Sequence, residues 1–132
     1  MHDLNDLLTL MARLRDPQDG CPWDIKQTAQ SIAPHTLEEA YEVVDAIELQ
    51  DWSHLKDELG DLLFQVVFLS RLGEEAGAFA FADVVDNVVA KLLRRHPHVF
   101  PQGTLDSRLP EGTRLSDAQI KANWDHIKAE ER

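Results

Sequence analysis

Hydrophobic residues recur every three or four positions along most of the chain, which is the period of an α-helix. No segment alternates hydrophobic and polar residues as a strand would, and no internal repeat or low-complexity tract is present. The pattern predicts an all-α fold, a helical bundle of four to five helices in a single domain spanning residues 1–132. We expect the helices over residues 3–15, 34–49, 53–76, 82–95 and 116–130.

Several residues mark the expected helix ends. Ser53 can cap the third helix and Gly77 is a natural stop after it. Ser116 followed by Gln119 forms the pattern of a capping box for the last helix. Residues 97–115 are rich in proline and glycine, so we expect an irregular segment there.

The third expected helix is hydrophobic on nearly all sides, and such a helix needs cover on both faces. In a chain of this length, a second subunit can supply that second cover. We therefore predict a homodimer with this helix near its interface. One stripe comprises Leu55, Leu59, Leu62, Leu63 and Val66, and the other comprises Phe64, Val67 and Phe68.

Two pairs of acidic residues stand at the same spacing on consecutive helices. Glu39 and Glu42 are three residues apart, and so are Glu58 and Asp61. A helix turns about 100° per residue, so each pair projects from one side of its helix. An antiparallel arrangement of the two helices would bring four carboxylates together, and a divalent cation would neutralise their repulsion.

The alternative interpretation is a solvated helix face, because isolated acidic pairs are common on surfaces. Two pairs flanking one expected turn, with Glu38 as a fifth acid, favour a metal site. Carboxylate oxygens suit Mg²⁺ or Mn²⁺, whereas zinc prefers Cys or His, and a di-iron bundle would use Glu-x-x-His repeats. Mg²⁺ held by carboxylates commonly binds phosphate oxygens as well, so phosphoanhydride cleavage is the expected chemistry.

A phosphate substrate also needs cationic and aromatic contacts. Lys91 and Arg95 are four residues apart on the fourth expected helix, although basic residues also favour helix C-termini through the helix dipole. Trp23 lies in a loop, and Trp124 precedes Lys128 by four residues on the last helix. Both tryptophans could stack on a base, or they could be core residues.

Composition narrows the class of protein. Hydrophobic residues make up 43% and charged residues 28%, as in folded globular domains. The net charge of −11 argues against a nucleic-acid partner. A single cysteine, Cys21, fits a reducing compartment, and residues 62–69 form an apolar stretch too short to cross a bilayer. Acidic residues interrupt the N-terminal pattern, unlike a signal peptide, so we expect a cytoplasmic protein without a membrane partner.

The motifs in combination resemble the MazG family of nucleoside triphosphate pyrophosphohydrolases, over about residues 7–130. The resemblance implies a dimerising helical bundle of the all-α NTP pyrophosphatase type. It also implies Mg²⁺-dependent hydrolysis of a nucleoside triphosphate to the monophosphate and pyrophosphate. The motifs are Cys21-Pro22-Trp23-Asp24 with Gln27-Thr28, Leu37-Glu38-Glu39-Ala40-Tyr41-Glu42-Val43, Glu58-Leu59-Gly60-Asp61-Leu62-Leu63 and Arg94-Arg95-His96-Pro97-His98-Val99-Phe100.

By this resemblance, each candidate residue takes a role. Glu38 would orient the attacking water or bind a further ion. Lys91 and Arg95 would contact the triphosphate, and Trp124 and Lys128 match a C-terminal substrate-contacting segment. The metal ligands would be Glu39, Glu42, Glu58 and Asp61.

The chain also departs from the family pattern. Ala90 stands where related sequences often carry Asp, and Ala29 where a His is common. Some members carry two tandem copies of the domain.

Taken together, the motifs favour a housekeeping NTP pyrophosphohydrolase. A selective dNTP or modified-nucleotide hydrolase and a non-catalytic nucleotide- or partner-binding dimer remain the alternatives.

Overall fold

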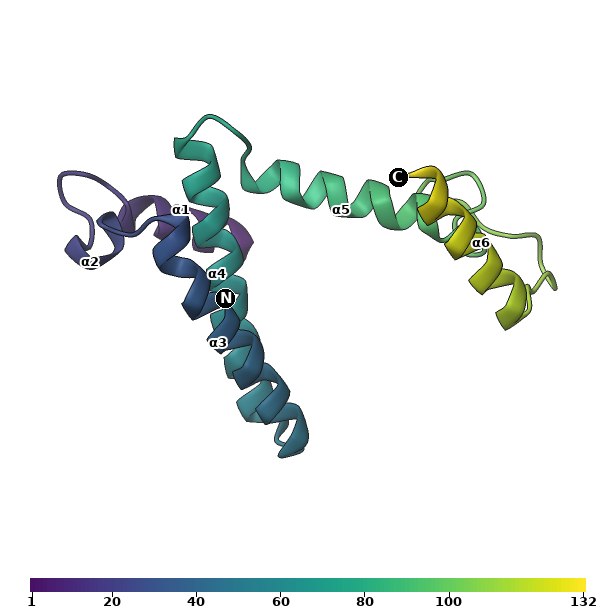
Figure 1. The fold of residues 1–132 in the computed structure, drawn as a ribbon, viewed down its shortest axis with the longest axis horizontal. Coiled ribbons are helices and arrows are strands. Elements are labelled where there is room, and N and C mark those ends of the chain that lie inside the picture. Colours follow the sequence, from purple (N-terminus) through teal and green to yellow (C-terminus); the bar gives the residue numbers. More distant parts are fainter. The chain divides into compact units, whose positions relative to one another are not determined.

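The computed structural model describes all 132 residues and contains six α-helices and no strand, which confirms the predicted all-helical class. None of the helices has both the length and the apolar composition that a bilayer-spanning segment needs. The chain divides into two compact units, Met1–Phe81 (the N-terminal unit) and Ala82–Arg132 (the C-terminal unit). The helices are α1 (Leu4–Leu14), α2 (Pro22–Ile25), α3 (Ala29–Glu48), α4 (Trp52–Glu75), α5 (Phe81–Arg95) and α6 (Asp117–Glu130) (Figure 1).

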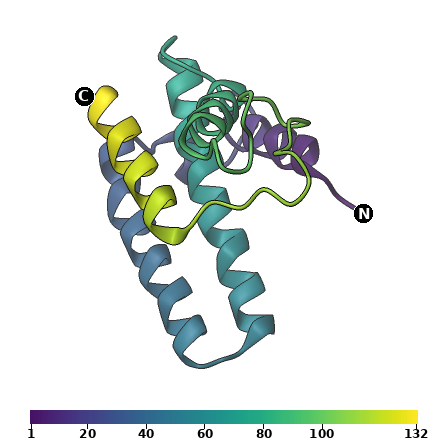
Figure 2. The same ribbon diagram turned by 90° about the vertical axis from the view of Figure 1, so that its right-hand side faces the viewer.

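Helices α3 and α4 form an antiparallel hairpin and lie side by side in both ribbon views (Figures 1 and 2). The turn between them is short, and Gln50 adopts a positive φ of 55° within it. The Asp51 side chain accepts a hydrogen bond of 3.1 Å from the His54 backbone N–H and caps α4. The cap was predicted at Ser53, and the difference arises because Asp51 is an equally good N-cap two residues earlier.

Helix α3 begins five residues before the expected start at Pro34. Thr28 caps it, and Ser31 completes a capping box: the Thr28 backbone N–H donates to the Ser31 hydroxyl at 2.8 Å. Pro34 therefore lies inside the helix, where its lack of an N–H removes one backbone hydrogen bond. The capping box and the burial of Ile32, which is 2% exposed, offset that loss.

The core of the N-terminal unit lies where α1, α3 and α4 meet. Met11 of α1, Ile32 of α3, and Val67 and Phe68 of α4 form one cluster of fully buried side chains. Phe64 packs against this cluster and meets the Phe68 ring edge-on at 5.9 Å. The stripe of α4 that contains Phe64, Val67 and Phe68 is therefore the one that the chain itself covers.

Arg15 links the segment after α1 to the end of α4 through hydrogen bonds and an ion pair. Its guanidinium donates hydrogen bonds to the carbonyl oxygens of Asp24 at 2.7 Å and Ile25 at 3.0 Å, and it also pairs with the Glu75 carboxylate. The arginine side chain is only 10% exposed and lies over the Phe68 ring. This arrangement holds the short helix α2, which the sequence analysis treated as loop, against the core.

The C-terminus of α4 matches the predicted stop. Gly77 has a φ of 70°, a left-handed conformation that glycine adopts without steric cost. The Gly77 N–H donates to the Glu74 carbonyl at 3.0 Å, and the Ala78 N–H donates to the Gly73 carbonyl at 2.9 Å. This pair of hydrogen bonds is a Schellman motif, which satisfies carbonyls at the end of the helix.

The C-terminal unit consists of most of α5, an irregular segment and α6. The predicted capping box of α6 is confirmed, since the Ser116 hydroxyl accepts from the Gln119 N–H at 3.2 Å and the Gln119 side chain accepts from the Ser116 N–H at 2.9 Å. Glu131, at the end of α6, pairs with both Arg94 and Arg95 of α5. These ion pairs join the two helices of the unit.

Candidate functional site

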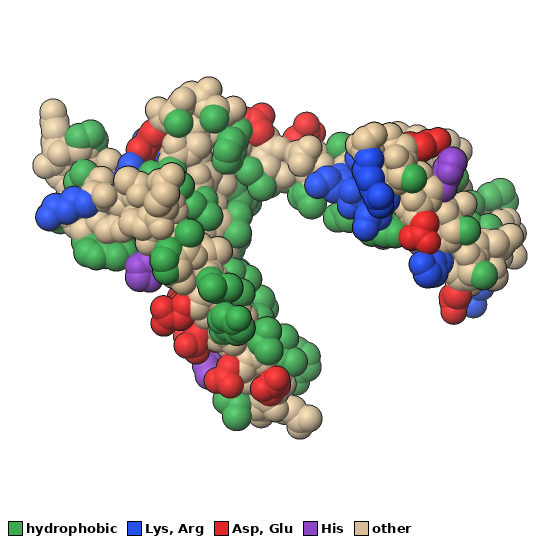
Figure 3. All heavy atoms as spheres, in the orientation of Figure 1, with side chains coloured by type: hydrophobic (Ala, Val, Ile, Leu, Met, Phe, Trp, Pro, Cys, Tyr) green, Lys and Arg blue, Asp and Glu red, His purple; other side chains and the backbone are tan.

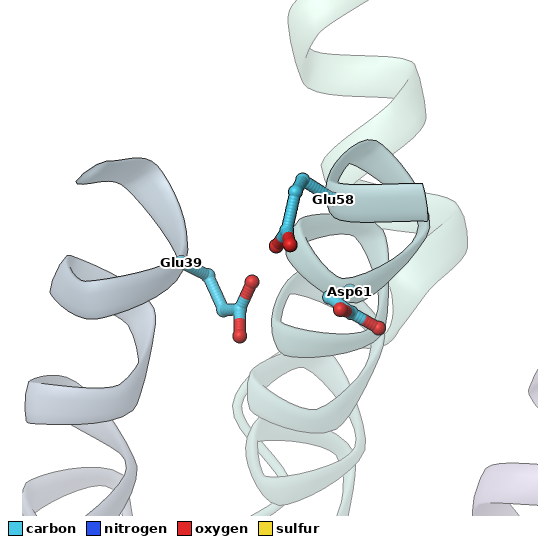
Figure 4. A group of neighbouring side chains, drawn as sticks. All are labelled: Glu39, Glu58 and Asp61. Carbon is cyan, nitrogen blue, oxygen red and sulfur yellow. The ribbon is translucent and has the colours of Figure 1, made fainter. Parts of the chain in front are cut away.

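Three carboxylates converge between α3 and α4. Glu39 reaches across from α3 toward Glu58 and Asp61 of α4 (Figure 4). Each side chain offers one carboxylate oxygen, and these three oxygens all lie within 4.8 Å of one another. The antiparallel hairpin produces this cluster, because it places the middle of α3 opposite the first half of α4.

The electrostatics of the cluster are those of crowded, partly desolvated acids. The pKa of Glu39 is raised from 4.5 to about 7 by partial burial first of all, and hydrogen bonding to Glu58 and the charges of Asp61, Glu58 and Glu42 contribute to the same rise. Desolvation followed by the charges of Asp57 and Glu58 raises the pKa of Asp61. The Oε2 atom of Glu39 is buried and has no hydrogen-bond partner.

These features fit a divalent cation. A buried carboxylate oxygen without a partner is expensive unless a cation or donor satisfies it. The cluster offers only carboxylate oxygens as ligands, which is the donor set that Mg²⁺ and Mn²⁺ prefer. Raised carboxylate pKa values in a confined cluster are also typical of functional sites.

Two of the predicted acids lie outside this group. Glu42 contributes charge to Glu39, three residues earlier on α3, but its carboxylate is not among the three that converge. Glu38 is exposed on the same helix. The structure thus brings together three of the four predicted ligands, and the roles of Glu42 and Glu38 stay predictions.

His54 also contacts the cluster, and it was not predicted from the sequence. His54 Nε2 lies 3.2 Å from Glu58 Oε1, one helical turn earlier on α4. The available signal was the spacing of four residues between a histidine and an acid on one helix. That signal is weak by itself, because the same spacing occurs in the exposed pair of His126 and Glu130.

Trp23, a candidate base-stacking residue, lies on α2 in the N-terminal unit. Its side chain is 53% exposed, and its ring meets the His35 ring of α3 nearly edge-on at 5.8 Å. One ring edge is therefore held in place while much of the surface stays accessible. This arrangement is compatible with stacking on a ligand.

The other predicted substrate contacts lie in the C-terminal unit. The Arg95 guanidinium lies 5.5 Å from the centre of the Trp124 ring and pairs with Glu131. Trp124 also borders a cavity of about 470 Å³ together with His96 and His98. Lys91 of α5 and Lys128 in the last turn of α6 complete the predicted set.

Comparisons with known proteins identify the family of the chain. Residues 27–100 match the model of the MazG nucleotide pyrophosphohydrolase domain, a range that contains all three converging acids. The chain belongs to the MazG family. A crystal structure of a MazG-related protein from Thermotoga maritima has the same fold, with a TM-score of 0.74 at 22% identity, covering 96% of this chain and 99% of that one.

Several curated relatives of this MazG chain are named as nucleoside triphosphate pyrophosphohydrolases. The nucleoside triphosphate pyrophosphohydrolase of Escherichia coli K12 is 48% identical over all 132 residues, which cover 47% of that protein. The nucleoside triphosphate pyrophosphohydrolase/pyrophosphatase MazG of Thermotoga maritima is 40% identical over 127 residues, which cover 96% of this chain and 44% of that protein. The chain therefore spans about half the length of these relatives.

Proposed function

We propose that this chain is a Mg²⁺-dependent nucleoside triphosphate pyrophosphohydrolase that produces a nucleoside monophosphate and pyrophosphate. The observation that carries the proposal is the convergence of Glu39, Glu58 and Asp61, with a buried, unpartnered oxygen on Glu39. Membership of the MazG family and the names of the full-length relatives support the same activity. We assign it a role in housekeeping of nucleotide pools.

The candidate residues have distinct roles in the proposed reaction. Glu39, Glu58 and Asp61 hold the cation, and Glu42 adds a fourth carboxylate one turn along α3. When bound, Mg²⁺, or Mn²⁺ in its place, supplies charge neutralisation for the triphosphate oxygens. Glu38 orients the water that attacks the α-phosphorus, and pyrophosphate leaves. The substrate-binding residues are Lys91, Arg95 and Lys128 for the phosphates and Trp23 and Trp124 for the base.

The activity is tested by pyrophosphate release from a panel of NTPs and dNTPs with Mg²⁺, with chromatographic identification of the nucleotide product. Glu58→Gln and Glu42→Ala should each lower kcat strongly, because each removes a carboxylate from the cation. Asp45→Asn is the matched control, since Asp45 is an exposed acid of α3 outside the cluster. Its turnover should equal that of the wild-type protein.

The outcomes separate the alternatives. Turnover that survives both carboxylate substitutions would overturn the assigned site. Nucleotide binding with no turnover of any substrate would favour a non-catalytic dimer. Turnover confined to one dNTP or a modified nucleotide would make the enzyme selective rather than housekeeping.

A homodimer is the second part of the proposal. Acidic side chains gather along one edge of the α3–α4 hairpin, and hydrophobic side chains gather along the opposite edge (Figure 3). Several large hydrophobic residues of the hairpin are between 38% and 68% exposed, which is typical of an interaction surface. They are Leu37, Tyr41, Val44, Ile47, Leu59, Leu63 and Val66.

Light scattering combined with size-exclusion chromatography tests the dimer at micromolar concentration. The wild-type chain should elute with twice its mass of 15.0 kDa, and Leu63→Asp should shift it toward the monomer. Leu105→Asp is the control, because Leu105 is 72% exposed in the C-terminal unit, away from the hairpin sequence. A wild-type monomer peak would overturn this part of the proposal.

We further propose that residues 1–132 form one MazG domain, which the family match across residues 27–100 supports because it includes residues of both units. A role in nucleotide pools implies a cytoplasmic protein. The net charge of −11 supports a small-molecule substrate rather than a nucleic acid. Mobility-shift assays with DNA and RNA should therefore show no complex.

A further inference from the structure

His54 is the only basic side chain that contacts the acidic cluster. Its Nε2 atom lies 3.2 Å from Oε1 of Glu58, and no Lys or Arg side chain bonds to Glu39, Glu58 or Asp61. Both partners are partly buried: the histidine side chain is 33% exposed and the glutamate side chain is 13% exposed. The contact is therefore shielded from water more than an ordinary surface pair.

The direction of the hydrogen bond depends on the histidine tautomer. An ionised carboxylate only accepts hydrogen bonds, so the tautomer that bonds to ionised Glu58 carries its proton on Nε2. His54 is itself fixed at the start of α4, where its backbone N–H donates to the Asp51 side chain at 3.1 Å. The donor thus comes from a capped, regular part of the helix, one turn before its acceptor.

Glu58 lies close to both of the other acids. One of its carboxylate oxygens is within 4.8 Å of an oxygen of Glu39 across the hairpin and of an oxygen of Asp61, three residues later on α4. A free glutamate side chain has three rotatable bonds and would turn away from two like charges. A donor on one oxygen holds the carboxylate in place and leaves the other oxygen to the cluster.

We propose that His54 is a positioning residue for the metal site: it donates from Nε2 to Glu58 and orients that carboxylate toward the cation held by Glu39, Glu58 and Asp61. The inference rests on the cation site of the proposed function. Carboxylate ligands of protein-bound metals are commonly oriented by such hydrogen bonds, and loss of the partner typically lowers metal affinity by about 10- to 100-fold. His54 does not touch the substrate or the reacting atoms in this role.

The test measures Mn²⁺ binding to the full chain, without nucleotide, by isothermal titration calorimetry. His54→Leu removes the donor at similar volume, and we expect its Kd to rise by about 10-fold or more. His54→Gln keeps an N–H donor four residues before Glu58, and it should recover most of the lost affinity. Circular dichroism melts of each variant show whether the helices remain folded.

The chain provides a matched control. His126 and Glu130 form a histidine–glutamate pair at the same spacing on α6, with Nε2 and Oε1 3.0 Å apart, but both side chains are about 70% exposed (72% and 67%). His126→Leu makes the same chemical change outside the cluster. Its Mn²⁺ affinity should match that of the wild-type protein.

The outcomes distinguish this inference from the proposed function. Wild-type Mn²⁺ affinity in a folded His54→Leu variant would overturn the role of His54 and leave the metal site intact. Equal losses in His54→Leu and His54→Gln would also overturn it, because a donor would then not be what matters. Absence of Mn²⁺ binding by the wild-type protein would overturn both proposals. If His54→Leu does not fold, His54→Gln and His54→Asn decide the question by their ability to donate to Glu58.

Discussion

Replacing Glu39 with glutamine should stabilise the metal-free protein while weakening its metal site. Partial burial and neighbouring acids raise the pKa of Glu39 from 4.5 to about 7, so holding it ionised in the folded state is unfavourable. Glutamine has nearly the same shape and carries no charge. Its amide can also donate a hydrogen bond to Glu58.

The magnitude follows from the pKa. At about 1.4 kcal/mol per pH unit, a rise from 4.5 to about 7 corresponds to roughly 3–4 kcal/mol when the group is fully ionised. Glu39 is only partly buried, so water screens part of this energy and we expect about 1–2 kcal/mol. For a domain of this size, that is roughly 4–8 °C in Tm.

The sign depends on pH. A carboxyl group with a raised folded-state pKa binds more protons when folded than when unfolded, so it lowers stability as pH rises from about 4.5 to about 7. The gain from Glu39→Gln should therefore be near zero at pH 4 and complete by pH 8. The two proteins should be compared at equal concentration, in EDTA and in Mg²⁺.

Thermal denaturation followed by circular dichroism measures this effect. In EDTA at pH 8, the variant should melt above the wild-type protein. In excess Mg²⁺, the wild-type Tm should rise by mass action, whereas the variant should gain little. Glu38→Gln is the matched control, because Glu38 is the exposed neighbour on α3 and should change stability by only a few tenths of a kcal/mol. A lower Tm for Glu39→Gln in EDTA at pH 8, or a gain independent of pH, would refute the reasoning.

Three further substitutions test the interactions that hold the N-terminal unit together. Hydrogen bonding from Arg15 holds the pKa of Glu75 below its usual value of 4.5, so Glu75→Gln should destabilise by about 1 kcal/mol near pH 7. Urea titrations should show that loss shrink as the pH falls below 4.5 and through the lowered pKa of the folded state. Gly77→Ala forces a non-glycine residue to a φ of 70° and should destabilise by about 1 kcal/mol. Gly60→Ala, at a helix-interior position with open space for a methyl group, should instead stabilise by about 0.5–1 kcal/mol, and equal urea midpoints for both glycine variants would contradict the backbone argument.

Local sequence signals predicted the elements well where a single residue type decides the outcome. Ser116 with Gln119 marked the start of α6, and Gly77 marked the end of α4. The predicted start of α3 was wrong because Pro34 is compatible with both the first turn and the interior of a helix. The capping box of Thr28 and Ser31 determines where α3 begins, and the two residues that form it are visible in the sequence.

The acidic cluster was predictable in part. Spacing alone placed Glu39, Glu42, Glu58 and Asp61 on facing sides of two helices, and the structure brings three of these carboxylates together. Which ones meet depends on the register of the hairpin, which is set by the turn at Gln50 and the cap at Asp51. Helical periodicity carries no information on that register, so the sequence could not separate Glu42 from the other three.

The two edges of the α3–α4 hairpin differ in chemistry, since one carries acidic side chains and the other exposes hydrophobic side chains (Figure 3). Beyond the core cluster of Met11, Ile32, Val67 and Phe68, Ala46 is the only other fully buried hydrophobic side chain. The part of the hairpin that carries the acids therefore buries few hydrophobic side chains, and repulsion between the like charges along one edge destabilises it. A partner covering the apolar edge and a cation neutralising the acidic edge would each stabilise the same pair of helices. We therefore expect metal binding and dimerisation to reinforce one another, because both favour the helix spacing at which Glu39 faces Glu58.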